Sequence, residues 1–120
     1  MQVFAHPEPD LEAKMPRYLF IARYASDGAK GVATAGGSAR REAIRGMVEG
    51  LGGRLDTFDF AFGGDDVYTT VDLPDNTTAA AVALAVNSSG HTTVRTVALL
   101  TPEEVDAAAK QTVHYIPPGG

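Results

Sequence analysis

The chain has 120 residues, and its hydrophobic fraction of 44% is enough to fill the core of a single domain. Its formal net charge of -5 at pH 7 argues against nucleic acid as a partner, and the absence of cysteine excludes disulfides and thiolate metal sites. No window approaches the roughly 18 apolar residues of a membrane span, and the N-terminus lacks the features of a secretory signal. We therefore expect a cytoplasmic protein without a membrane partner.

The first 37 residues contain one clear element between two irregular stretches. Residues 1–14 show no hydrophobic period, which predicts a flexible N-terminal extension, and Met15 looks like a natural start. The apolar and aromatic run at residues 17–24 predicts a buried strand. Residues 25–37 are rich in Gly and Ala, and we interpret them as a loop with at most one helical turn.

Residues 38–51 give the clearest helix signal in the chain. Apolar side chains recur there at helical spacing, Ser38 is a suitable N-cap, and Gly52-Gly53 supplies a stop. Two strands are predicted next, at residues 54–62 and 66–73, with a turn between them. Alternation predicts one face of the second strand with Val67, Thr69, Val71 and Leu73, and an opposite face with Tyr68, Thr70 and Asp72. In the first strand the shared face would carry Phe58, Phe60 and Phe62.

The last third of the chain predicts a helix, a strand and a second helix. The helix at residues 77–90 is apolar nearly all round, so we expect its outer side to be covered. Residues 91–100 predict a strand, and Thr-Pro-Glu-Glu at 101–104 is a strong helix start. The folded domain is expected to span residues 15–113, followed by an extended tail at 114–120.

This order of elements predicts an α+β fold, namely a ferredoxin-like βαββαβ antiparallel sheet with an extra C-terminal helix. Both main helices would cover one face of the sheet and leave the other open. A second copy of the chain is the expected cover, so we predict a homodimer or higher homo-oligomer built through the face of Tyr68, Thr70 and Asp72. Two such sheets face to face form a dimeric α+β barrel.

Several motifs resemble the GYD-domain family, from about Met15 to the C-terminal Pro-Pro-Gly. They are GGSARREA (36–43), LGG (51–53), FAFGGDDVYTTVDLPD (60–75) and ALAVNSSGHTTVRTVALLTPEEVDAA (83–108). The resemblance implies the dimeric α+β barrel fold and an unassigned activity. The family has an aromatic residue just before the position matched by Asp66, where this chain has Asp65, and Tyr68 is the candidate substitute.

Carboxylates gather around residues 59–75. Because the first strand should lie between the third and the fourth, Arg23, Asp72 and Arg95 could form a cross-strand charge ladder. Ordinary surface ion pairs are the simpler interpretation. Asp65, Asp66 and Asp75 are expected in turns, where Asp is favoured for local backbone hydrogen bonds.

The start of the helix at residues 38–51 is the candidate ligand site. Arg40 and Arg41 stand in its first turn, against the helix dipole, and helical spacing turns Arg40 toward the sheet. A guanidinium directed inward needs either an internal carboxylate, such as Asp66 or Asp72, or a bound anion. The predicted binding residues are Ser38, Arg40, Arg41, Asp66, Tyr68 and Asp72.

No cofactor or metal is predicted. The three histidines, His6, His91 and His114, lack ligand spacing, and neither a nucleophile elbow nor a nucleotide-binding glycine motif is present. Three functions remain open: a domain that binds a small anionic molecule, with a regulatory role as one form of it; a cofactor-independent oxygenase or isomerase for an acidic or phenolic substrate; and a structural or partner subunit. A pocket where Arg40, Tyr68 and a carboxylate converge would favour the enzyme.

Overall fold

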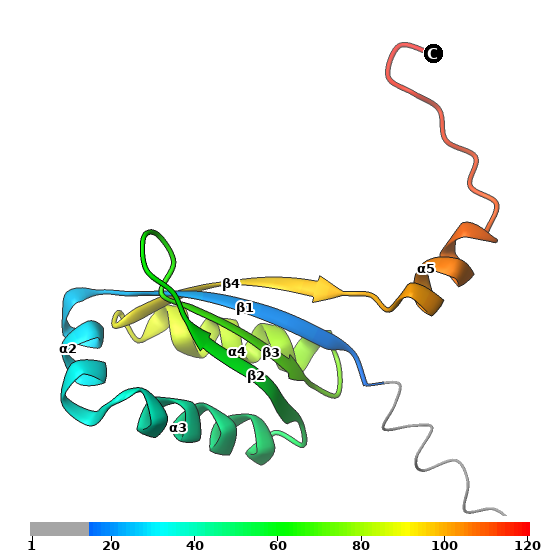
Figure 1. Ribbon diagram of the computed structural model, residues 1–120. Helices are drawn as coiled ribbons and strands as arrows, with labels where there is room; N and C mark the ends of the chain where they lie inside the picture. Colours follow the sequence, from blue (N-terminus) through cyan, green and yellow to red (C-terminus); the bar gives the residue numbers. More distant parts are fainter. Residues whose placement is uncertain (1–14) are drawn as a thin grey trace, which may run out of the picture.

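A computed structural model describes residues 15–120, which form a four-stranded sheet, two helices packed beneath it and two further helices (Figure 1). In chain order the elements are β1 (Arg17–Tyr24), α2 (Ser26–Ala35), α3 (Gly37–Gly50), β2 (Arg54–Phe60), β3 (Val67–Asp72), α4 (Asn76–Ser88), β4 (Thr92–Leu99) and α5 (Pro102–Ala109). The predicted extension at residues 1–14 lies outside the described residues. Within the described part of the chain, no helix is long and apolar enough to cross a membrane.

The sheet has the strand order β2-β3-β1-β4 and is antiparallel throughout. Helices α3 and α4 both lie on one face, and the other face is uncovered in the single chain (Figure 1). This arrangement confirms the predicted ferredoxin-like α+β fold with an added C-terminal helix.

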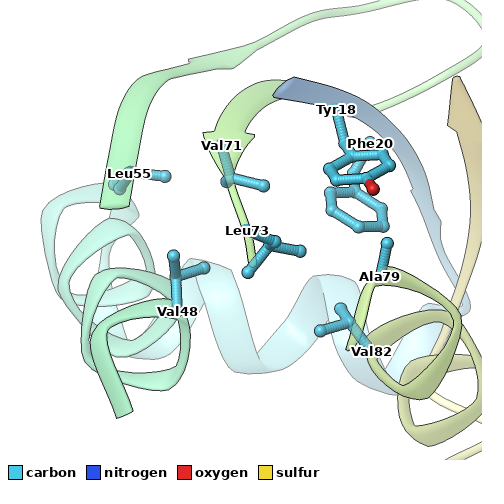
Figure 2. Close-up of a cluster of buried hydrophobic side chains, with 8 residues drawn as sticks. All are labelled: Tyr18, Phe20, Val48, Leu55, Val71, Leu73, Ala79 and Val82. Atoms are coloured by element: carbon cyan, nitrogen blue, oxygen red, sulfur yellow. The ribbon is translucent and has the colours of Figure 1, made fainter. Parts of the chain in front are cut away.

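The hydrophobic core lies between the sheet and its two helices. Strand residues Tyr18, Phe20 and Val71 face Val48 of α3 and Val82 of α4, and Leu73 fills the space between them (Figure 2). Val71 and Leu73 are fully buried, as the alternation along residues 66–73 predicts. The core therefore fixes which side of each strand faces the helices.

The uncovered face consists of rows of side chains set by the strand register. Thr57, Thr70, Leu19 and Val97 form one row. Asp59, Tyr68, Ile21 and Arg95 form the next. Arg54, Asp72, Arg17 and Leu99 form the row at the end where β4 finishes. Apolar side chains therefore occupy the middle of this face, and charged side chains stand toward both ends.

Two predictions between residues 25 and 51 are wrong. Residues 26–35 form a ten-residue helix, α2, in place of the expected loop. Ser38 is not an N-cap, because α3 begins at Gly37 and Ser38 lies inside the helix. The N-cap position is Gly36, whose φ of 96° favours glycine, and no side chain caps this end. The predicted stop is confirmed: Gly52 has a φ of 83°, and the Gly53 amide donates to the Val48 carbonyl.

The phenylalanine face of β2 is only partly as predicted. The strand ends at Phe60, and Phe62 is fully exposed in the following turn. A register shift between Leu55 and Thr57 lets β2 bend, and after it the Phe58 and Phe60 rings meet edge to face with centroids 5.4 Å apart. Only Phe58 packs against the core.

The last helices differ in how they are held. In α4 Asp75 is the N-cap, Ala79 and Val82 are buried, and Leu84 is 72% exposed, so the outer side expected to be covered is open in the single chain. The predicted capping box of α5 is confirmed by reciprocal bonds between Thr101 and Glu104. However, α5 projects from the end of β4 away from the sheet, and every residue from 100 to 120 is exposed (Figure 1).

Candidate functional site

An open cavity of about 600 Å³ lies on the helix side of the sheet, between α2, α3 and the C-terminal end of α4. Its walls are mostly small or apolar side chains: Val32 and Ala35 from α2, Ala39, Ala43 and Met47 from α3, and Ala85 and Val86 from α4. Tyr24, Asp27, Arg40, Ser89, His91 and Thr92 supply its polar groups. Polar groups gathered in an otherwise apolar cavity of this size are typical of a small-molecule site.

Arg40 and Tyr24 stand at the bottom of this cavity. Both also line a smaller, apolar space of about 50 Å³ that continues toward the core residues Phe20 and Val71. The Arg40 guanidinium lies within hydrogen-bonding reach of the Tyr24 hydroxyl. Burial raises the pKa of Tyr24, and the bond and charge of Arg40 oppose part of that rise. The phenol therefore stays protonated at neutral pH and can donate a hydrogen bond.

Arg40 makes no ion pair with a carboxylate among residues 15–120. The internal bridge to Asp66 or Asp72, one of the two alternatives raised by the sequence, is therefore absent from the described residues. Asp66 instead accepts a hydrogen bond from the Tyr24 amide at 2.8 Å, and its own amide donates to the Ala22 carbonyl. Asp66 thus holds the end of β1, which places Tyr24 against Arg40.

Asp27 and His91 form a second polar group at the cavity wall. The Asp27 carboxylate lies 2.7 Å from His91 Nδ1, and both side chains are more than half exposed. The Ala25 amide donates to the His91 carbonyl at 2.9 Å, so the start of α2 is tied to the loop before β4. Sequence reasoning missed this pair, because 64 residues separate its members and residues 25–37 were interpreted as a loop.

The six predicted binding residues do not form one site. Arg40 lines the cavity, and Asp66 does not line it but accepts a hydrogen bond from the amide of Tyr24, which does. Ser38 and Arg41 are exposed on the outside of α3, where Arg41 pairs with Glu42 at 3.0 Å. The other two, Tyr68 and Asp72, lie on the uncovered face of the sheet. The convergence of Arg40, Tyr68 and a carboxylate that would have favoured the enzyme is therefore not found, and Tyr24 is the tyrosine beside Arg40.

The possible ladder of Arg23, Asp72 and Arg95 does not form, and these side chains make ordinary ion pairs instead. Antiparallel pairing sets Asp72 opposite Arg17, and its carboxylate lies 3.1 Å from Arg17 Nε and 2.8 Å from Arg54 Nη2. Arg23 and Arg95 lie toward the other end of the face and share Asp65, at 3.9 Å and 3.2 Å. Sequence periodicity predicts the face on which a charge lies but not its row, which depends on register.

Asp65 occupies the position where the resemblance leads one to expect an aromatic residue. Its carboxylate lies between Arg23 and Arg95, and the Tyr68 hydroxyl lies 3.4 Å from it. The Tyr68 ring therefore stands beside this position on the uncovered face rather than in the cavity. Over residues 15–120, no group of three His, Cys, Asp or Glu side chains is placed to hold a metal ion.

The comparison with protein families agrees with this architecture. A family model described as the GYD domain matches residues 18–109, which run from β1 to the end of α5. Neither a curated protein nor a solved structure gave a match.

Proposed function

The chain belongs to the GYD domain family, and we propose that it binds a small, largely apolar molecule that carries an anionic group. The site is the cavity between α2, α3 and α4. The observation that supports this most directly is Arg40, a half-buried guanidinium at the bottom of an apolar cavity with no carboxylate partner in the described residues. A buried charge without a counterion is costly, so a bound anion would stabilise it.

The chemistry beside Arg40 favours a carboxylate or phenolate. A guanidinium can bind both oxygens of a carboxylate, and the protonated Tyr24 hydroxyl can donate a further hydrogen bond. The apolar space behind these groups and the small side chains of the walls suit a hydrocarbon or aromatic body. An open cavity with converging polar groups also supports ligand binding over a purely structural subunit.

Arg40→Met tests this proposal, with Arg41→Met as the matched control on the exposed side of the same helix turn. A cation in the first turn of a helix costs about 0.3–1 kcal/mol, so the ligand-free Arg40→Met variant should be at least as stable as the parent. Benzoate and octanoate should raise the unfolding temperature of the parent and of Arg41→Met but not of Arg40→Met. Inorganic phosphate tests whether an anion without an apolar body suffices.

Two results would contradict the proposal. One is an unchanged response of Arg40→Met to every carboxylate that stabilises the parent. The other is a loss of about 3–5 kcal/mol in the ligand-free variant, which would mean that Arg40 neutralises a buried carboxylate. Native mass spectrometry of the protein as isolated would add a direct measurement, since a bound molecule should appear with the parent and Arg41→Met only.

A second candidate function, a cofactor-independent enzyme for an acidic or phenolic substrate, is favoured by the Asp27–His91 pair. If His91 Nδ1–H donates its hydrogen bond to the Asp27 carboxylate, His91 Nε2 is left free to take a proton from a molecule in the cavity. Arg40 would then hold the substrate's anionic group while His91 moves the proton, as an isomerase requires. Deuterium exchange into phenylpyruvate, measured by NMR above the buffer rate, tests this function. Exchange should fall in His91→Gln, whereas binding without exchange would support a binding domain.

We further propose that the protein acts as a homodimer joined through the uncovered sheet face. Leu19 and Val97 form an apolar strip in the middle of that face with Ile21, which is already 7% exposed in the single chain, and Tyr68 lies beside it. Val97 and Tyr68 are 37% and 39% exposed in the single chain. Because the cavity lies on the opposite side of the sheet, dimerisation would leave it accessible.

A further inference from the structure

We propose that residues 100–120 form an arm that packs on a second copy of the chain, against the end of the partner's sheet where Arg23 and Arg95 lie. This inference rests on the proposed homodimer and is independent of the ligand. Its starting observation is that α5 and the residues after it extend from β4 away from the sheet (Figure 1). Every residue from 100 to 120 is exposed in the single chain.

The exposed side chains of this arm are too apolar for a solvated tail. Leu100, Val113, Tyr115 and Ile116 are 64–77% exposed, and Val105 of α5 is 51% exposed. An isolated eight-residue helix is marginal in water, because too few hydrogen bonds repay its nucleation. Yet α5 has a complete capping box. A well-capped helix followed by exposed apolar residues indicates that the arm packs on another surface.

Charge favours the Arg23 and Arg95 end of the uncovered face. Residues 102–110 carry Glu103, Glu104 and Asp106 against Lys110 alone, so α5 is acidic. Arg23 and Arg95 share the single carboxylate of Asp65, and their side chains are 61% and 63% exposed. An acidic helix beside this pair would supply a second counterion.

The position of the arm identifies a second copy as its partner. Strand β4 runs from the Arg95 end of the face to the end beside Arg17, and the arm leaves from there. It would have to reverse direction to reach Arg95 of its own chain. In a dimer whose facing strands run in opposite directions, each arm begins beside the Arg23 and Arg95 end of its partner. A two-fold axis then provides both copies with the same contact.

Disulfide trapping tests this contact in the full chain, which has no cysteine of its own. The variant Arg95→Cys with Glu103→Cys should form a covalent dimer on mild oxidation. The matched control, Thr34→Cys with Glu103→Cys, replaces Arg95 by an exposed position on α2 and should stay largely monomeric on a non-reducing gel. Loss of both thiols without a covalent dimer would place the arm on its own chain and overturn the proposal.

Charge reversal and deletion give two further readouts by sedimentation. Arg95→Glu or Glu103→Arg alone should raise the dimer dissociation constant about tenfold. The double variant should restore the constant to within about threefold of the parent value. Deleting residues 101–120 should raise it by at least about tenfold. If the parent is a dimer and the deletion leaves the constant unchanged, the arm proposal fails and the homodimer stands. If the parent is itself a monomer, both fail.

Discussion

Arg40 and Asp72 are two partly or fully buried charges whose surroundings differ. Asp72 is only 5% exposed, and guanidinium groups from β1 and β2 satisfy its carboxylate. Arg40 lies near enough to the Tyr24 hydroxyl to oppose the rise in its pKa, and it pairs with no carboxylate of the described residues. Of these two charges, only that of Arg40 lacks a counterion in the described residues, so a bound anion could stabilise it. Asp72, although predicted as a binding residue, has its partners within the chain.

We expect Asp72→Asn to lower the free energy of unfolding by about 1–3 kcal/mol. The substitution keeps the shape of the side chain but removes the charge that strengthens its bonds to Arg17 and Arg54. The matched variant Arg54→Gln, at a side chain that is 68% exposed, should cost less than about 1 kcal/mol. Urea unfolding at one fixed protein concentration measures both. Equal losses in the two variants would mean that the carboxylate has no special structural role.

At the scale of elements, α2 determines whether there is a cavity at all. None of its residues is buried, yet Asp27, Gly28, Gly31, Val32 and Ala35 form one wall. Its N-terminal end is held by the bond from the Ala25 amide to the His91 carbonyl and by the Asp27–His91 pair. Gly28 allows this close approach, because a Cβ there would collide with the His91 carbonyl oxygen.

The two glycines within α2 should therefore respond in opposite ways to alanine. Gly31→Ala should stabilise the protein by up to about 1 kcal/mol, since it improves helix propensity and a Cβ at this position meets no atom within 4 Å. Gly28→Ala should destabilise it despite the same gain in propensity, because α2 must move away from the His91 loop. Thermal unfolding followed by circular dichroism compares them. A stabilised Gly28→Ala variant would show that α2 is not docked on that loop.

At the scale of the whole molecule, one sheet separates two different surfaces. The helix side carries the core and the candidate ligand cavity. The uncovered side carries an apolar middle with ion pairs toward both ends. Pairing of two such faces would bury the apolar strip and leave both cavities open to solvent. The proposed ligand and the proposed partner would therefore not compete for the same surface.

We expect light scattering to give a dimer mass at micromolar concentration. Val97→Asp, in the middle of the uncovered face, should shift the mass toward the monomer, because it introduces a charge into an apolar interface. The control is Leu84→Asp on the outer side of α4, where the side chain is already 72% exposed and the mass should not change. A stable monomer for the parent would contradict the interface, as would a dimer that withstands Val97→Asp.

The sequence by itself was sufficient to predict the fold. The run at residues 17–24 predicts a buried strand, and the alternation at 66–73 and the helical spacing at 38–51 indicate which side of each element is buried. Burial is the main determinant of this α+β layering. Local signals were equally reliable where a short motif provides hydrogen bonds for the backbone groups at a helix end, as at Gly52-Gly53 and in the Thr101–Glu104 capping box. The orientation of Arg40 toward the sheet also follows from helical spacing alone.

Only the tertiary structure decided which residues meet. Asp72 pairs with Arg17 and Arg54, and not with Arg23 or Arg95, because strand register sets the row of a charge and one-dimensional periodicity carries no register. Helix α2 escaped prediction because its glycines have low helix propensity and its position depends on docking against the His91 loop. The cavity, with Tyr24 beside Arg40 and Asp27 beside His91, depends on contacts between residues far apart in the sequence, so only the tertiary structure shows it.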